Sequence, residues 1–287
     1  MSIPPIDIGK LSEPATKLIE KISDAVEGIF RPYQIKRIAE AEAQADKIKA
    51  VSQVEITEIQ YKAMRRFFAE EAKKQVNMDN ITAKALPELN PDAKPEQMED
   101  DWITNFFDKS RLISDDQMQT LWAKLLAGEA NSPGRYSKRT VDLLASMDKS
   151  DAELFKNLCS FGWVIFGVVP IVFEPSDNIY TTRQINFDVL RHLDAIGFAT
   201  FDGVGEYRKT TLPKSITVLY YGRLVELTFP QEANNDLAVG KVLLSKAGEQ
   251  LAPLCGSQPC LGFMDYVINK WRSLGVTVNV VGGLPSI

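Results

Sequence analysis

The stretch that decides the fold runs from Ser114 to Cys159 and reads SDDQMQTLWAKLLAGEANSPGRYSKRTVDLLASMDKSDAELFKNLC. Ser114 precedes Gln117 by three residues, which is the spacing of a capping box at a helix N-terminus. Apolar residues then recur at the spacing of one buried helix face, namely at Met118, Leu121, Trp122, Leu125 and Leu126. The pattern predicts an amphipathic helix with Trp122 in a protein core.

Two further helices are expected downstream of this one. Gly128 either caps the first helix or permits close packing, and the turn sequence Ser132-Pro133-Gly134 separates it from the second. Ser150 and Glu153 have the spacing of another capping box and predict the start of the third helix. Because short turns join the three helices, we expect them to pack as one compact block.

Two helices are also predicted upstream of this block. Ser12 is the expected cap of the first, with Pro14 in its first turn and an apolar stripe from Leu18 to Phe30. A very long second helix is expected between Tyr33 and Leu86, because this stretch lacks Gly and Pro and is rich in helix formers. β-branched and polar residues at 52–57 predict a break in it.

The apolar positions of these two helices bear on association between chains. Part of the long helix fits a coiled-coil heptad seam, at Ile38, Ala41, Ala45 and Ile48. The apolar residues continue at spacings of four, at Ile59, Ala63 and Phe67. One small core cannot cover stripes of this length, so we predict a homo-oligomer, most simply a dimer, formed through Pro14 to Met78. The alternative is a hairpin that buries both stripes on the central block of the same chain.

The C-terminal part changes character. Three prolines punctuate an acidic connector at 86–97, and strand signals appear after Pro170. Strands are expected at 215–221 and 223–229, joined at Gly222, and at 239–244. Valines alternate with polar residues from Val276 to Val280, which predicts a last strand. Short helices are expected between these strands.

The predicted fold is mainly α with a C-terminal α+β part. We expect a long-helix arm and linker at residues 1–96, a central helical block at 97–170 and an α+β domain at 171–287. A helix followed by a strand pair and another helix is compatible with a winged-helix arrangement, so the last domain is expected to be winged-helix-like.

Candidate binding residues gather in two short motifs of the central block. Arg135, Lys138 and Arg139 form a small basic cluster beside Ser137, and such a cluster suits a phosphate group or an acidic partner. The alternative interpretation is a solvated helix start. Asp101 and Trp102 complete the candidate set, although the acidic residues before Trp102 also favour a helix N-terminus.

Catalytic signals are absent from the sequence. The chain has one histidine, His192, and a Ser–His or Cys–His pair would have to use it without any nucleophile motif beside it. Cys255 and Cys260 are close in sequence, so a metal or redox pair is one interpretation and a pair of buried thiols in a turn is the other. The glycine motifs that bind phosphate are missing. We therefore predict no catalytic residue, no metal site and no cofactor.

Composition narrows the class of protein. A net charge of −5 over 287 residues argues against general nucleic-acid binding. Three cysteines and an N-terminus without an export signal predict a cytoplasmic protein. The run from Phe161 to Phe173 is 13 residues long, whereas a membrane-spanning helix needs about 20. We expect a buried strand or core segment there and no transmembrane segment.

Three motifs carry a resemblance to known proteins: EDDWITNFFD (Glu99 to Asp108), LWAKLLAGE (Leu121 to Glu129) and SPGRYSKRT (Ser132 to Thr140). Through them the chain resembles an uncharacterised bacterial family, a domain of unknown function. It is more distantly similar to the alpha-type abortive-infection proteins of phage defence. The resemblance implies a bacterial intracellular protein with a link to defence, and it supplies no catalytic residues.

Three functions remain open at this point. The first is a non-enzymatic interaction or regulatory protein of bacteria, linked to phage defence or stress, with a protein partner. The second is a nucleic-acid-binding regulator that uses its C-terminal domain, although basic residues are sparse on the C-terminal helices: Arg191, Lys246, Lys270 and Arg272. The third is a hydrolase with a site that the sequence does not reveal.

Overall fold

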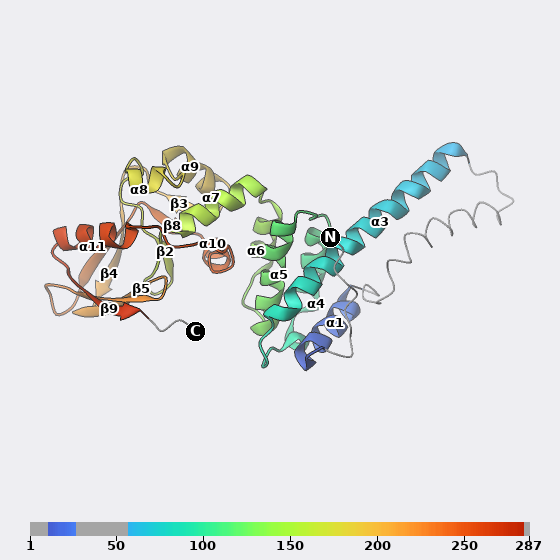
Figure 1. The fold of residues 1–287 in the computed structure, drawn as a ribbon, viewed down its shortest axis with the longest axis horizontal. Helices are drawn as coiled ribbons and strands as arrows, with labels where there is room; N and C mark the ends of the chain where they lie inside the picture. Colours follow the sequence, from blue (N-terminus) through green and yellow to red (C-terminus); the bar gives the residue numbers. More distant parts are fainter. Residues whose placement is uncertain (1–10, 27–56, 284–287) are drawn as a thin grey trace. The chain divides into compact units, whose positions relative to one another are not determined.

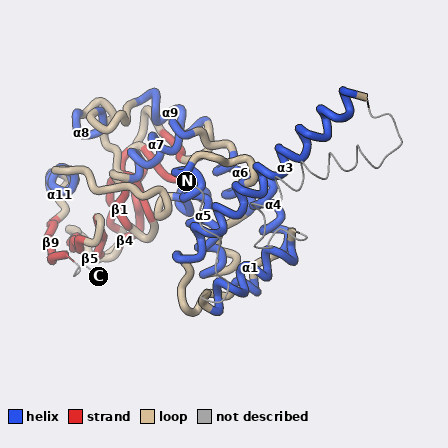
Figure 2. The backbone as a smooth tube through the Cα atoms, turned by 45° about the vertical axis from the view of Figure 1, so that its right-hand side comes forward, coloured by secondary structure: helices blue, strands red, loops and turns tan. Residues whose placement is uncertain are grey.

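The computed structural model describes residues 11–26 and 57–283 (Figure 1). Contacts group the chain into two compact units, Met1–Ala145 and Ser146–Ile287, where the sequence suggested three domains. The described strands all belong to the second unit (Figure 2). The prediction of helices throughout, with strands in the C-terminal part, is confirmed.

The N-terminal unit contains helices and two short 3-10 turns. Its described elements are α1 (Glu13–Ala25), α3 (Glu58–Ala85), η2 (Leu86–Glu88), η3 (Pro95–Gln97), α4 (Asp100–Ser110), α5 (Asp116–Asn131) and α6 (Lys138–Ala145). α3 packs on α5, α4 packs on α6, and α1 packs on α4 and η3. Ser12 caps α1 as predicted, whereas the predicted heptad seam at 38–48 lies outside the described residues.

α5 is the central helix of this unit. Trp122 is completely buried, and its ring meets the edge of Phe106 with 5.1 Å between the centroids. The helix begins at Asp116, because the Asp115 carboxylate accepts the backbone N–H groups of Gln117 and Met118. The capping box predicted at Ser114 is therefore wrong by one residue: the carboxylate at 115 takes the place of the hydroxyl at 114.

The third predicted helix of the central block belongs to the other unit. α7 (Lys149–Cys159) follows a capping box formed by Asp148 and Asp151, so the box predicted at Ser150 and Glu153 is wrong. α7 packs on α9 (Phe187–Ala195) within the C-terminal unit. α5 and α6 instead share a core with α1, α3 and α4. The boundary between the two units therefore lies before Ser146, ahead of α7.

The proline-rich connector is packed against α5. Asn131 at the end of α5 accepts the Asn90 backbone N–H at 2.8 Å and donates to the Glu88 carbonyl at 3.0 Å. The Lys94 N–H donates to the Ala130 carbonyl at 3.0 Å. Ala93 and Pro95 in this connector are buried. Residues that the composition indicated as a linker therefore cover the C-terminal end of the central helix.

The C-terminal unit is an α+β assembly. Besides α7 and α9 it contains β1 (Gly162–Val164), β2 (Val168–Pro170), α8 (Asn178–Thr181), β3 (Ala199–Phe201), β4 (Tyr207–Leu212), β5 (Ser215–Tyr220), β6 (Arg223–Thr228), β7 (Asn235–Gly240), β8 (Val242–Leu244), α10 (Lys246–Leu251), α11 (Phe263–Ser273) and β9 (Thr277–Gly283). Five strands form an antiparallel sheet in the order β2-β1-β5-β6-β9. Two pairs, β3 with β8 and β4 with β7, make smaller sheets.

Two glycines explain how the strands are joined. β5 and β6 form the predicted hairpin, and Tyr221 and Gly222 in its turn both have positive φ, 45° and 78°. The strand predicted at 239–244 is divided in two at Gly240, where φ is 89°. A Cβ at Gly240 would lie 2.1 Å from the Val172 carbonyl oxygen, so only glycine permits this close approach.

Aromatic rings fill the core of the C-terminal unit. Trp163 on β1 stacks on Tyr220 of β5, with 5.1 Å between the ring centroids. Trp163 and Trp271 on α11 also meet edge to face, with 5.0 Å between their centroids. The Trp271 Nε1–H donates to the Ala238 carbonyl at 2.9 Å. β1 and β2 both lie in the segment from Phe161 to Phe173 and pair with each other, so this segment is two short strands, and Phe166 between them is 77% exposed. None of the described helices is long and apolar enough to cross a membrane.

We predict that Trp122→Ala lowers the free energy of unfolding by about 3–5 kcal/mol, because it removes the largest side chain at the centre of the N-terminal core. Chemical denaturation followed by circular dichroism measures this change. Leu112→Ala is the control, since Leu112 is exposed and its truncation should change stability by less than about 0.5 kcal/mol. Equal effects of the two substitutions would contradict the central role of Trp122.

Candidate interaction site

The predicted basic cluster lies where α6 begins, next to the start of α4. The Lys138 ammonium is 3.4 Å from the Asp101 carboxylate, so two of the candidate residues do come together. Both side chains are exposed. The Arg135 guanidinium lies over the Tyr136 ring, 5.4 Å from its centroid. Binding of an acidic ligand by Arg135, Lys138 and Arg139 stays a prediction.

Two other candidate residues have structural contacts. Trp102 is buried and stacks on Phe106 with 5.2 Å between centroids, so it belongs to the core of the N-terminal unit. The Ser137 hydroxyl lies 3.0 Å from the Thr140 hydroxyl and accepts the Thr140 N–H, which is the arrangement of a helix cap. These contacts account for both residues without a ligand.

Glu129 is a buried carboxylate that sequence reasoning missed. It accepts the backbone N–H groups of Gly134 at 2.6 Å and of Tyr136 at 2.8 Å. Burial raises the pKa of Glu129, and the two backbone hydrogen bonds act against that rise. A Cβ at Gly128 would lie only 2.8 Å from the Tyr136 ring, so glycine lets this ring cover the helix. The SPGRY segment is thus a turn organised around Glu129.

The projecting part of α3, Glu58 to Gln75, contains no buried residue. The buried residues of α3 all lie beyond it, at Asn77, Met78, Ile81, Thr82 and Ala85. Ile59 is 80% exposed and Phe67 is 58% exposed, with the exposed Ala63 between them. Figure 1 shows this part of α3 extending past the helices on which its other end packs. The predicted stripe of Ile59, Ala63 and Phe67 is thus uncovered among the described residues.

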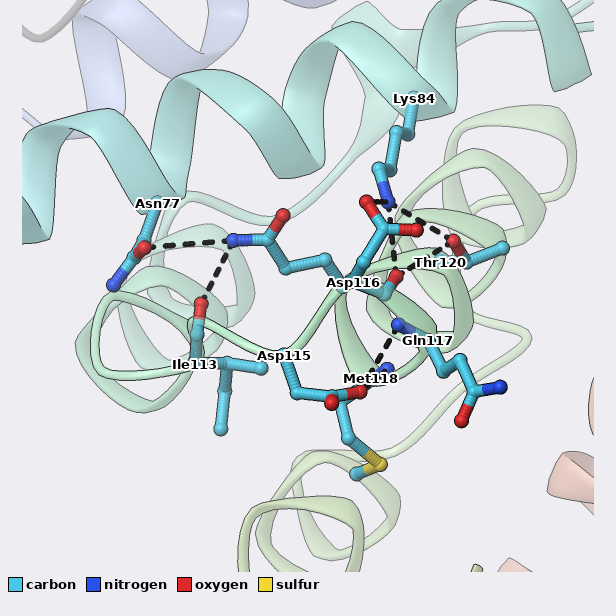
Figure 3. A network of polar contacts seen from close by, with 9 residues as sticks. Asn77, Lys84, Ile113, Asp115, Asp116, Gln117, Met118 and Thr120 are labelled. Carbon is cyan, nitrogen blue, oxygen red and sulfur yellow. Dashed lines mark hydrogen bonds and ion pairs between the residues drawn. The ribbon is translucent and has the colours of Figure 1, made fainter. Parts of the chain in front are cut away.

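A charged contact anchors the other end of α3. The Lys84 ammonium donates to the Asp116 carboxylate at 2.6 Å, to the Asp116 carbonyl at 2.9 Å and to the Thr120 hydroxyl at 3.1 Å (Figure 3). An ammonium has three N–H donors, and here each has an acceptor. The contact therefore fixes Lys84 at the first turn of α5.

A pair of buried amides forms the second anchor. The Gln119 amide donates to the Ile113 carbonyl at 2.9 Å and to the Asn77 side-chain oxygen at 3.4 Å (Figure 3). Asn77 in turn donates to the Arg111 carbonyl at 2.9 Å. The two amides thus join α3, α5 and the loop between α4 and α5. A shift of α3 along α5 would leave these buried groups without partners, at a cost of about 1–3 kcal/mol each.

His192 belongs to a contact between two helices of the C-terminal unit. Its Nε2 lies 2.7 Å from the Asp151 carboxylate, which also accepts the Asp148 backbone N–H in the cap of α7. A carboxylate beside a histidine is one part of a catalytic triad. The described residues give His192 no hydroxyl or thiol partner, and they contain no group of three or more side chains placed to hold a metal ion.

A hollow of about 270 Å³ lies elsewhere in the C-terminal unit. Phe187 and Phe201 line it, with their rings edge to face at 5.2 Å. Lys241 at its rim is 3.5 Å from the Glu174 carboxylate, so these two charges offset one another. The hollow offers apolar contact but no arrangement of acid, base and nucleophile. The projecting part of α3 is therefore the better candidate site.

Comparison with known proteins places the chain in one family. Residues 61–268 match the family described as "Protein of unknown function (DUF2806)", which covers most of the chain. The chain belongs to this family. No curated protein and no solved structure matches the chain significantly.

Asp79 near the base of the projecting part gives a test of the folded α3. Burial raises the pKa of Asp79 to about 6, although the Gln75 amide donates to its carboxylate at 2.9 Å. Because the folded pKa lies above the unfolded one, Asp79 stabilises the fold at low pH and this contribution is lost as pH rises through about 6. Above that pH the buried carboxylate costs stability.

We therefore expect Asp79→Asn to raise the free energy of unfolding by about 1–2 kcal/mol at neutral pH, after allowance for partial exposure, and to have little effect near pH 4. Urea denaturation at the two pH values measures the difference. Asp92→Asn, at an exposed carboxylate of the same unit, is the control and should be neutral at both. A destabilised Asp79→Asn at neutral pH would show that the charge is needed.

Proposed function

We propose that this member of the family is a non-enzymatic interaction protein, which docks through the projecting part of α3 on a second copy of itself. The observation that carries the proposal is the exposed apolar stripe on a firmly anchored helix. Exposed apolar surface on a soluble chain usually marks an interaction site. The anchors at Lys84 and Gln119 support it, because they hold the helix in one direction before a partner binds.

The charges along the projecting part favour a protein partner. Acidic and basic side chains pair within the helix: Glu58 with Lys62 at 2.6 Å, Arg66 with Glu70 at 3.3 Å and Glu71 with Lys74 at 2.6 Å. A helix that binds nucleic acid or anionic lipid presents an unbroken basic face. The mixed face of α3 instead suits a protein surface with its own mixed charges.

A second copy of α3 provides such a surface. In an antiparallel pair centred on Ala63, Ile59 of one copy lies opposite Phe67 of the other. The small Ala63 side chains then permit close approach of the two helices. Glu58 of one copy comes near Arg66 of the other, so opposite charges flank the apolar contact. The interface is isologous, as in most homodimers.

The cellular setting is the less direct part of the proposal. The motifs quoted above resemble those of an uncharacterised bacterial family and, more distantly, of abortive-infection proteins. The proposal therefore places the dimer in the bacterial cytoplasm, in phage defence or a stress response. A regulatory protein in that setting acts by contact with other proteins, for which an anchored helical surface is suited.

Light scattering of the full chain tests the dimer. We expect a dimer for the natural sequence and a monomer for Ile59→Asp/Phe67→Asp, because each copy would bring two carboxylates into the interface, where the four like charges would face one another. Leu112→Asp is the matched control: Leu112 is 67% exposed in the same unit, and its variant should remain dimeric.

Thermal unfolding checks that all three proteins fold, since both stripe residues are exposed in the single chain. A natural sequence that stays monomeric at every concentration, or a stripe variant that stays dimeric, would overturn the proposed interface.

The alternative function is a nucleic-acid-binding regulator with a winged-helix-like C-terminal domain. The α+β composition of the second unit supports it, but the contacts of its basic residues do not. Lys270 lies over the Phe173 ring at 5.8 Å, and Arg272 donates to the Val278 carbonyl at 3.0 Å. Lys246 pairs with Glu249 at 3.7 Å. A hydrolase remains the third hypothesis, which the contact of His192 with Asp151 supports.

We predict that the full chain does not bind duplex DNA with sub-micromolar affinity at low salt. Phosphate neutralisation supplies most non-specific affinity, and basic residues of α10 and α11 are engaged within the protein. Fluorescence anisotropy with a labelled duplex measures binding. Tight binding that weakens steeply with added salt would favour the nucleic-acid hypothesis over the interaction protein.

A further inference from the structure

The hollow of the C-terminal unit is built from segments that are distant in sequence. Its lining comes from the loop before α8, the start of α9, the end of β3 and the link between β7 and β8, and includes Glu174, Ser176, Phe187, Phe201, Gly203 and Lys241. Its volume of about 270 Å³ is below the range of about 300–1,000 Å³ that is usual for drug-sized ligands. The hollow therefore suits a smaller molecule.

Two aromatic rings give the hollow its apolar surface. The rings of Phe187 and Phe201 lie 5.2 Å apart, with 79° between their planes. Phe187 is 49% exposed, so part of its ring is open to contact. The Asn186 side chain accepts the Val189 N–H at 3.0 Å and thereby caps α9 directly before Phe187. The rings are thus held in place as one surface on which another ring can pack.

Gly203 keeps that surface open. A Cβ at this position would lie 3.0 Å from the Phe187 ring and 3.7 Å from the Phe201 ring. The backbone conformation does not require glycine here, because the φ of Gly203 is not positive. The Asp202 carboxylate holds the loop by accepting the Val204 N–H at 2.9 Å. The space beside the two rings is therefore the physical reason for a glycine at this position.

One positive and one negative charge also line the hollow. The Lys241 ammonium lies 3.5 Å from one oxygen of Glu174, which is longer than the roughly 2.7–2.9 Å of a close charge-assisted hydrogen bond. The Ser176 hydroxyl donates to the other Glu174 oxygen at 3.3 Å. An ammonium has three donors and a carboxylate has several acceptor positions, so each can bind a further group of opposite charge.

We propose that this hollow binds a free aromatic α-amino acid. The ligand carboxylate pairs with Lys241, the ligand ammonium pairs with Glu174, and the ligand ring packs on Phe187 and Phe201. An amino acid carries its two charges on one carbon atom, so they are close together, as the charges of Lys241 and Glu174 are. A ligand with a single charge would meet a like charge in the hollow. The site is independent of the proposed α3 interface.

Isothermal titration calorimetry of the full chain with L-phenylalanine tests the proposal. We expect saturable binding of one molecule per chain, with a dissociation constant below about 1 mM. N-acetyl-L-phenylalanine lacks the ammonium and L-phenylalaninamide lacks the carboxylate, so each should bind at least about tenfold more weakly. A chain that does not bind L-phenylalanine at about 10 mM, or that binds the three compounds equally, would overturn the proposal.

Variants of the two charged residues assign their roles. Glu174→Gln should weaken L-phenylalanine at least about tenfold without weakening N-acetyl-L-phenylalanine, because that compound has no ammonium to pair. Lys241→Met should weaken L-phenylalanine to the same extent without weakening L-phenylalaninamide, which has no carboxylate. A variant that weakens all three compounds equally would contradict the assigned pairs.

Gly203→Ala tests the contact with the rings. It should weaken L-phenylalanine about fivefold or more, because the added Cβ takes up space beside both rings. Val204→Ala is the matched control: Val204 is 97% exposed and does not line the hollow, so its variant should bind as the natural sequence does. Equal affinities of the two variants would contradict the proposal. Thermal unfolding checks that each variant folds, and the comparison of ligands on the natural sequence decides the question if one does not.

Discussion

The contact of α3 with α5 is the interaction on which the N-terminal unit depends. Apolar residues at the end of α3 provide the packing, but apolar contacts alone allow a helix to slide by a turn. The buried amides of Asn77 and Gln119 remove that freedom, because each has a partner only in one register. Lys84, with three acceptors at the start of α5, acts in the same way. The exposed part of α3, with its apolar stripe, is thereby held in a fixed direction.

The motifs of the central stretch have structural explanations of their own. LWAKLLAGE contributes Trp122 to the core, Gly128 to the contact with Tyr136 and Glu129 to the turn that follows. SPGRYSKRT begins with that turn and continues into the cap of α6 at Ser137. A buried carboxylate with two backbone donors fixes a turn as firmly as a side-chain cap fixes a helix. The contacts of both motifs therefore reflect folding requirements of the N-terminal unit.

In the C-terminal unit, Tyr221 in the β5–β6 turn bonds two segments that are distant in sequence. This residue has φ of 45°, which is uncommon for an aromatic residue. The hairpin turn requires positive φ there, and the hydroxyl is fixed by its bonds to Cys159 and Ser257. The neighbouring Tyr220 bonds the Ser160 carbonyl and the Cys260 N–H. The β5–β6 turn thus holds together the end of α7 and the loop after α10.

The sequence by itself determined the local elements. The spacing of apolar residues, together with cap and turn residues, predicted α1, α5, α6 and the β5–β6 hairpin. These signals act between residues that are only a few positions apart. The caps of α5 and α7 were misplaced by one or two residues, since several neighbouring polar side chains compete for the same N–H groups. Tertiary structure alone decided which elements share a core. α7 follows α5 and α6 directly in the sequence, but it packs on α9 in the other unit. It also decided that Glu129 and Asn77 are buried and that Tyr221 bonds both Cys159 and Ser257. Such pairings depend on how distant segments pack, and no local pattern records that.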